Sequence, residues 1–102
     1  MGQREVIIKE SVADSIAEIA WFIESKGLVT TAEKFADNVY DFFIKLADSR
    51  RSHATCRDPE RATIGYKCIP YKKKYIIVFL ESDDELIICE FIPSKNIHWR
   101  LY

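Results

Sequence analysis

An apolar stripe at helical spacing constrains the fold of this chain more than any other feature. Its members recur every three or four residues, which places them on one face of an α-helix. Such a helix must bury its apolar face against another element. We therefore predict a long helix that ends near Ser49 and packs on a core. The stripe consists of Ala32, Phe35, Ala36, Val39, Phe42, Phe43, Leu46 and Ala47.

A second, shorter stripe precedes the first and predicts another helix. Ser11 with Asp14, and Thr30 with Glu33, have the spacing of capping boxes, in which side chains satisfy the free amides of a helix start. Gly27 is expected to end the first of the two helices. Because the link between them is short, the helices should form an antiparallel hairpin. The stripe consists of Val12, Ile16, Ile19, Ala20 and Ile23.

Four short runs of β-branched and aromatic residues predict strands, one before the helices and three after them. The stretch from Arg50 to Thr63 lacks a period and is expected to be a loop. The order is therefore β-α-α-β-β-β, an α+β fold whose helical hairpin covers one face of a mainly antiparallel sheet. Residues 1–102 are enough for one domain. The strands are expected at Glu5–Lys9, Ile64–Ile69 (closed by Pro70), Tyr75–Leu80 and Leu86–Ile92.

Alternation along the last of these strands assigns its side chains to two faces of the sheet. We predict that Ile87, Cys89 and Phe91 pack on the helices, and that Leu86 and Ile88 point away from them. The second face is then partly apolar as well, so it needs a cover or a binding partner.

The three cysteines, at positions 56, 68 and 89, fit neither a disulfide framework nor a zinc pattern. Cys68 and Cys89 lie in apolar runs and are expected to be small buried residues in a cytoplasmic protein with reduced thiols. His53 and Cys56 have the spacing of two metal ligands, but four are usual, so we expect no metal and no cofactor. No run of 18 apolar residues occurs, which predicts no transmembrane helix and no membrane partner.

The formal net charge of −1 conceals a strong local asymmetry. Residues 1–49 carry a net charge of −4 and residues 75–102 a net charge of −3. Residues 50–74 carry eight basic and two acidic side chains, a net charge of +6. Clustered basic side chains focus a positive potential, which attracts a phosphate backbone or an acidic protein segment. A solvated loop that keeps the protein soluble explains the same pattern.

Five segments occur in an order shared with a known family. They are Ser11–Ile19, Ala32–Phe35, Gly65–Lys67, Lys74–Phe79 and Asp83–Ile88. Phe43, Leu46 and Ala47, near the end of the second predicted helix, belong to the same pattern. By their order and spacing, from about Val6 to Trp99, the chain resembles the RelE/ParE superfamily, the toxins of bacterial type II toxin–antitoxin modules of the plasmid-stabilisation type.

This resemblance implies a cytoplasmic toxin that a cognate antitoxin neutralises by wrapping over its helices and sheet. ParE-like members bind and poison DNA gyrase, whereas RelE-like members cut messenger RNA on the ribosome without a metal. The acid-rich helical hairpin is typical of ParE-like chains, so inhibition of gyrase is favoured. A metal-free endoribonuclease and an inactive antitoxin-binding domain are the alternatives, and a homodimer is compatible with all three.

Metal-free RNA cleavage needs a base, a cation that stabilises the phosphorane, and an acid for the leaving oxygen. The tail from Ile92 to Trp99 departs from the His-Gly-Arg-Arg-Asp-like stretch of the family, and only Lys95 stands near a family arginine. For a ribonuclease, the candidates are Arg57, Arg61 and Lys67 as cations, Glu60 or a lysine as the base, and His98 or Tyr102 as the acid.

Overall fold

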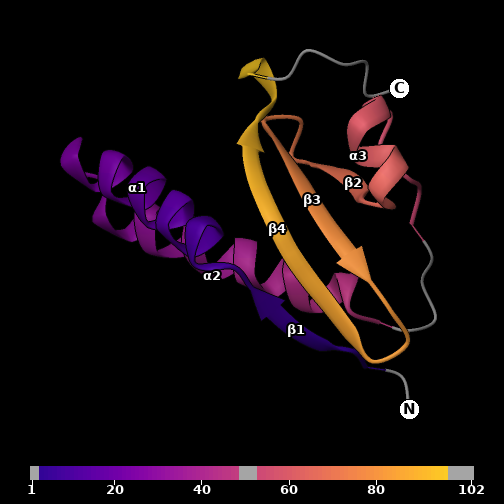
Figure 1. Cartoon of the computed structure of the whole chain (residues 1–102). Helices are drawn as coiled ribbons and strands as arrows, with labels where there is room; N and C mark the ends of the chain where they lie inside the picture. Colours follow the sequence, from indigo (N-terminus) through magenta and orange to yellow (C-terminus); the bar gives the residue numbers. More distant parts are fainter. Residues whose placement is uncertain (1–2, 49–52, 97–102) are drawn as a thin grey trace.

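The computed structural model describes residues 3–48 and 53–96 and confirms the α+β class and the element order. Two long helices pack with a four-stranded sheet, and a short third helix follows them (Figure 1). None of the helices in the described residues has the length and apolar character that crossing a membrane requires. The elements are β1 (Glu5–Ile8), α1 (Glu10–Ser25), α2 (Val29–Leu46), α3 (Pro59–Ile64), β2 (Lys67–Tyr71), β3 (Tyr75–Glu81), β4 (Glu85–Pro93) and the 3₁₀ turn η1 (Ser94–Asn96).

The sheet places the first strand beside the last. Its order is β1-β4-β3-β2, in which β1 runs parallel to β4 and the other two pairs are antiparallel. The nine residues of β4 pair with β1 over the first part of the strand and with β3 over nearly all of it. The prediction of a mainly antiparallel sheet is therefore confirmed.

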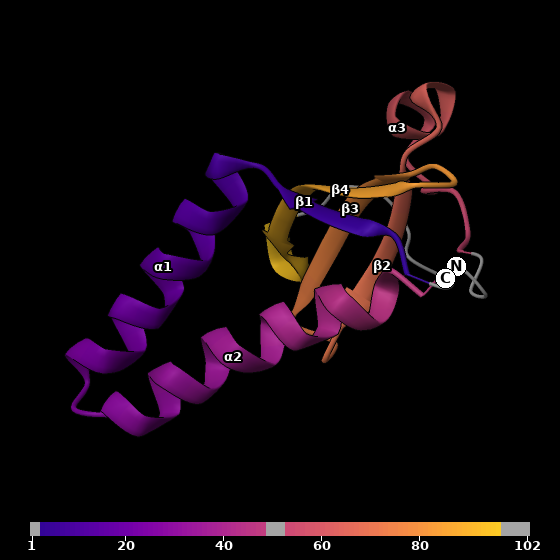
Figure 2. The same cartoon turned by 90° about the horizontal axis from the view of Figure 1, so that it is seen from below.

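The two long helices diverge from a short connection (Figure 2). Gly27 in this connection has a φ of +83°, a conformation that favours glycine, and its N–H donates to the Glu24 carbonyl. α1 leads from the end of β1 away from the sheet to this connection, and α2 runs from the connection back beneath the sheet (Figure 2).

Neither predicted capping box forms. The first helix begins at Glu10 and the second at Val29, in each case one residue before the expected capping side chain. The residues at the two N-cap positions are Lys9 and Leu28, and neither makes a side-chain capping hydrogen bond. Both helices are therefore held by the burial of their apolar faces more than by their ends.

Most of the core lies between the helices and one face of the sheet. Phe43 of α2 is fully buried, and its ring meets that of Phe91 edge-on, with centroids 6.5 Å apart. Phe91 also stacks on Tyr75 with centroids 4.7 Å apart. Such aromatic pairs add to the stability gained from burial alone. The predicted stripe of α2 is confirmed as its core-facing side by the buried residues Ala32, Val39, Phe43 and Leu46.

A β-bulge interrupts the pairing of β3 with β4. Val78 pairs with Glu90, but its neighbour Phe79 pairs with Ile88, so that Cys89 is the extra residue of β4. A bulge of this kind shifts the alternation of side chains by one position. The even-numbered residues of β4 therefore face the helices before the bulge, and the odd-numbered residues face them after it.

The predicted faces of β4 are consequently wrong before the bulge and correct after it. Leu86 and Ile88 are fully buried in the cluster that packs on the helices, although they were expected on the other face. Phe91 lies in this cluster as predicted. Ile87 pairs with Ile7, which is 37% exposed on the opposite face of the sheet.

The basic stretch holds more regular structure than its sequence indicates. Where a loop was expected, α3 begins at Pro59 and ends at Ile64, and it is followed by Gly65, which has a φ of +95°. Pro at the start and Gly just past the end are typical of a helix. Ile64 belongs to this helix and not to β2, and Pro70 lies inside β2, an edge strand that tolerates the missing N–H.

The interpretation of the cysteines requires a correction. Cys56 and Cys68 form a disulfide, with Cα atoms 4.7 Å apart. They meet because the segment before α3 runs antiparallel beside β2, where Thr55 pairs with Lys67. This pairing joins residues that the sequence separates by twelve positions, so the spacing did not reveal it. Cys89 is a free, buried cysteine, as predicted.

Candidate functional site

Arg61, one of the predicted cations, is engaged by two carboxylates. Its Nε and Nη2 donate to Glu90 Oε2 and Oε1 at 2.8 and 2.7 Å, a bidentate pair. Its Nη1 donates to Asp58 Oδ2 at 2.8 Å. The hydrogen bonds to Glu90, followed by those to Asp58, raise the pKa of Arg61 above its usual range. The arrangement anchors α3 to β4.

The other predicted cations do not converge on Arg61. Lys67 pairs with Phe79, a residue of the helix-facing core, and its Nζ lies 3.4 Å from Thr55 Oγ1. Glu90, the partner of Arg61, belongs to the opposite side of the sheet because it pairs with Val78. The structure therefore separates Lys67 from Arg61 by the thickness of the sheet.

The remaining catalytic candidates are exposed or outside the described residues. Arg57 is exposed beside the disulfide, and Glu60 is exposed in the first turn of α3. The two acid candidates, His98 and Tyr102, lie outside the described residues. Of the predicted set, the structure therefore places Arg57, Glu60, Arg61 and Lys67.

His53 takes part in a polar contact that the sequence did not indicate. Its Nδ1 lies 2.9 Å from Glu81 Oε2, and its ring meets the edge of Phe79 with centroids 5.1 Å apart. The same carboxylate lies 3.9 Å from Arg4 Nη1. Cys56, the other residue of the suggested metal pair, is in the disulfide. In residues 3–48 and 53–96 no group of three or more metal-ligating side chains occurs.

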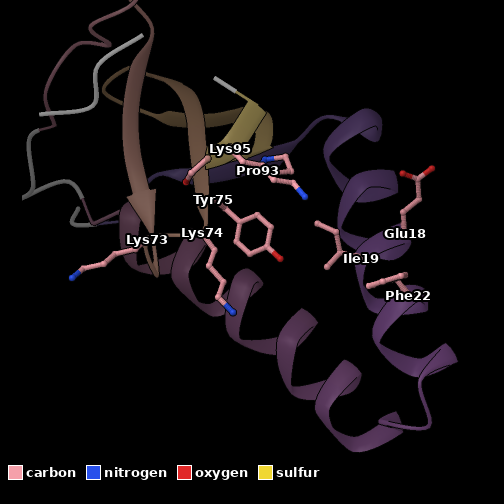
Figure 3. Close-up of a pocket in the computed structure, with 9 residues that line it drawn as sticks. Glu18, Ile19, Phe22, Lys73, Lys74, Tyr75, Pro93 and Lys95 are labelled. Atoms are coloured by element: carbon pink, nitrogen blue, oxygen red, sulfur yellow. The ribbon is translucent and has the colours of Figure 1, made fainter. Parts of the chain in front are cut away.

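A groove opens between α1 and the end of the sheet (Figure 3). Tyr75 extends from β3 toward Ile19 of α1, and Pro93 lies at the end of β4 (Figure 3). These apolar surfaces enclose a volume of about 510 Å³. The groove is lined by Glu18, Ile19, Phe22, Lys73, Lys74, Tyr75, Pro93, Ser94 and Lys95.

Two of the lysines that line the groove, Lys73 and Lys74, come from a tight turn between β2 and β3, and the third, Lys95, comes from η1. Lys72 and Lys73 have φ values of 52° and 61°, and the turn is closed by the Lys74 N–H, which donates to the Tyr71 carbonyl. Two consecutive positive φ angles match a type I′ hairpin turn, where Asn and Gly are preferred. Lysine at both positions is strained, and such strain often marks a functional surface.

The groove combines an apolar floor with a mainly basic rim. Lys74 and Lys95 are exposed, and the Lys74 carbonyl accepts a hydrogen bond from the Ser94 N–H at 2.8 Å, which ties the turn to the end of β4. Ser94 Oγ is buried at the same place without a hydrogen-bond partner among the described residues. The chemistry therefore suits an apolar or aromatic side chain whose neighbours are acidic.

Apolar side chains are also exposed around the connection between the helices. Trp21 is 70% exposed, and the Phe22 ring lies 4.4 Å from Lys26 Nζ, a cation–π contact. Phe22 belongs to the groove as well, so the two surfaces are continuous along α1. The exposed large apolar residues near this connection are Trp21, Phe22, Leu28 and Val29.

The sequence contained only part of the signal for the groove. Lys73 and Lys74 belong to the basic stretch that the sequence revealed, but nothing local connected them with Ile19 or Phe22. The comparisons with known proteins add no template: no family model matches the chain, and no curated protein matches it.

Proposed function

We propose that this chain is the toxin of a bacterial toxin–antitoxin pair, acts in the cytoplasm and is held inactive by its cognate antitoxin. The observation that carries the proposal is the groove, whose apolar floor and lysine rim are suited to an acidic segment of a protein partner. The resemblance of five ordered sequence segments to the RelE/ParE superfamily supports the same function.

The toxin is proposed to act by binding a protein target, with DNA gyrase as the target that the resemblance implies. A ribonuclease of this kind needs a cation that can reach the scissile phosphate. Arg61 is instead held by Glu90 and Asp58. Lys67 lies on the other side of the sheet from Arg61, so the exposed Arg57 has neither of these two cations positioned with it for one phosphate. The exposed apolar side chains around the helical connection, by contrast, favour a protein contact.

Expression of the chain without its antitoxin tests the function. We expect arrested growth, induction of the DNA-damage response and cleaved chromosomes, together with inhibition of gyrase supercoiling by the purified protein. Loss of translation together with cut messenger RNA would refute gyrase inhibition and support the ribonuclease function instead. Normal growth combined with tight antitoxin binding would refute a toxic activity and show that the chain is an inactive antitoxin-binding domain.

The place of the antitoxin is tested by charge reversal at the groove. The double variant Lys74→Glu, Lys95→Glu should bind the product of the adjacent short gene at least about tenfold more weakly, because two rim cations become anions. The matched control is Lys34→Glu, Lys45→Glu, which makes the same change on exposed positions of α2 away from the groove. Equal affinities of the two double variants would refute the groove as the antitoxin site.

A further inference from the structure

The disulfide lies on the side of the sheet opposite α2, within a segment that covers a second apolar cluster. We call residues 54–66 the cover segment. Its first part is paired with β2, because Thr55 forms an antiparallel bridge with Lys67 and the Cys68 N–H donates to the Ala54 carbonyl. Its two ends are joined as well, because the Cys56 N–H donates to the Tyr66 carbonyl. Cys56 is only 4% exposed and Cys68 is partly exposed.

The cluster under the cover segment is separate from the main core. Ile76 and Val78 are fully buried there with Cys56, and Tyr66 and Ile92 pack against them. The cluster beneath the helices includes neither cysteine of the disulfide. Loss of the disulfide would therefore loosen the cover segment and leave the packing of α1 and α2 on the sheet in place.

Besides the backbone pairing with β2 and the apolar packing, two side-chain links hold the cover segment with α3 to the sheet. One is covalent, through Cys56 and Cys68, and the other is the ion pair of Arg61 with Glu90, whose side chains are 24% and 35% exposed. A partly exposed ion pair contributes little by itself, and a six-residue helix is not stable in isolation. The disulfide is thus the stronger of the two attachments.

We propose that Cys56–Cys68 is a redox modification site, a substrate for thiol–disulfide exchange that releases the cover segment and exposes the second apolar cluster. The reductant is a dithiol, such as a reduced protein with two neighbouring cysteines. This inference goes beyond the proposed toxin function and does not depend on it.

The exchange balances as a two-electron reduction. A thiolate of the dithiol attacks the Sγ of Cys68, the more exposed of the two cysteines, and forms a mixed disulfide while the Cys56 sulfur leaves as a thiolate. The second thiolate of the reductant then attacks the reductant's own sulfur in the mixed disulfide and releases the Cys68 thiolate. The reductant ends as a disulfide, and the two protein thiolates take up protons from the solvent.

Hydrogen exchange on the whole purified chain, oxidised and after reduction with dithiothreitol, tests the proposal. The N–H groups of Ala62, Gly65 and Tyr66 donate within the cover segment, and on reduction they should exchange about 100-fold faster, the effect of removing a cross-link over a short loop. Amides in the middle of α2 should exchange at unchanged rates.

Variants and a redox titration complete the test. Cys56→Ser with Cys68→Ser should exchange fast in both conditions, whereas Cys89→Ser, which removes the free thiol, should respond to reduction as the wild type does. If the double variant fails to fold, the reduced wild type supplies the same comparison. The proposal is overturned if the bond survives a dithiothreitol redox buffer set to the potential of a reducing protein dithiol, if the protein purified without reductant has Cys56 and Cys68 free to alkylation, or if reduction leaves exchange of the cover segment unchanged.

Discussion

Arg61 and Glu90 form a bidentate ion pair that joins α3 to β4 across 29 positions of the sequence. Arg61 was a candidate catalytic cation in the sequence, but in the structure it anchors the short helix α3. It also gives Glu90, a carboxylate in the middle of a sheet face, a partner for each of its oxygens. Such pairing is what allows a charged side chain to remain on a partly covered surface.

The ion pair should contribute measurably to stability. A double-mutant cycle of Arg61→Ala and Glu90→Ala is expected to give a coupling energy of about 1 kcal/mol, because the pair is bidentate but partly exposed. The free energy of unfolding in urea provides the measurement. Arg57→Ala, an exposed basic residue nearby, should change it by less than about 0.5 kcal/mol. A coupling near zero would show that α3 is anchored by the disulfide alone.

Substitutions that relieve the strain in the turn between β2 and β3 should stabilise the fold. Replacing Lys72→Asn and Lys73→Gly supplies residues that accept positive φ and should raise the free energy of unfolding by about 1 kcal/mol. If the turn serves partner binding, the same variant should bind the antitoxin more weakly despite its greater stability. Thermal unfolding and a binding titration, carried out side by side, separate the two effects, and an unchanged stability would contradict the assigned strain.

Phe43 should be essential for the main core. Phe43→Ala is expected to cost about 3–5 kcal/mol, because the ring is fully buried among aromatic partners and its loss leaves a cavity. Phe22→Ala makes the same chemical change at a side chain that is 56% exposed and should cost much less. Denaturant unfolding measures the loss of unfolding free energy in each variant. Similar losses would show that Phe43 is not central to the core.

Tyr71 should make the fold sensitive to alkaline pH. Burial of the phenol raises its pKa above the usual value, and the carboxylate of Asp41 adds to the effect. The unfolded chain therefore releases this proton first, so the contribution of Tyr71 to stability is complete below about pH 10 and is lost as the pH rises toward the folded-state pKa. Tyr71→Phe should lose less stability between pH 9 and pH 11 than the wild type. Identical pH profiles would assign the alkaline transition to other groups.

The predictable part of this fold resides in local patterns. The stripe that includes Val39 and Phe43 required a helix, because only a period near 3.6 places those residues on one face. The capping boxes at Ser11 and Thr30 were predicted by the same local reasoning and failed, since burial of Val12 and Ala32 decides where the helices begin more than a single cap does.

The candidate site was less accessible to this reasoning than the fold. Arg57, Arg61 and Lys67 were correctly seen as a basic cluster in sequence, but sequence proximity does not state on which side of a sheet a residue lies. The bulge at Cys89 illustrates the reason, because one extra residue exchanges the two faces of β4 without leaving a trace in the alternation of apolar side chains.

The sequence alone therefore determined the two long helices, the four strands, their order and the charge asymmetry, all of which arise from residues close together in the chain. The tertiary structure decided which distant residues meet. It joined Cys56 to Cys68 and Arg61 to Glu90, and it placed Tyr75 across a groove from Ile19. These contacts depend on how the strands pair and how the helices diverge, and such choices are made by packing of the whole domain and not by any local segment.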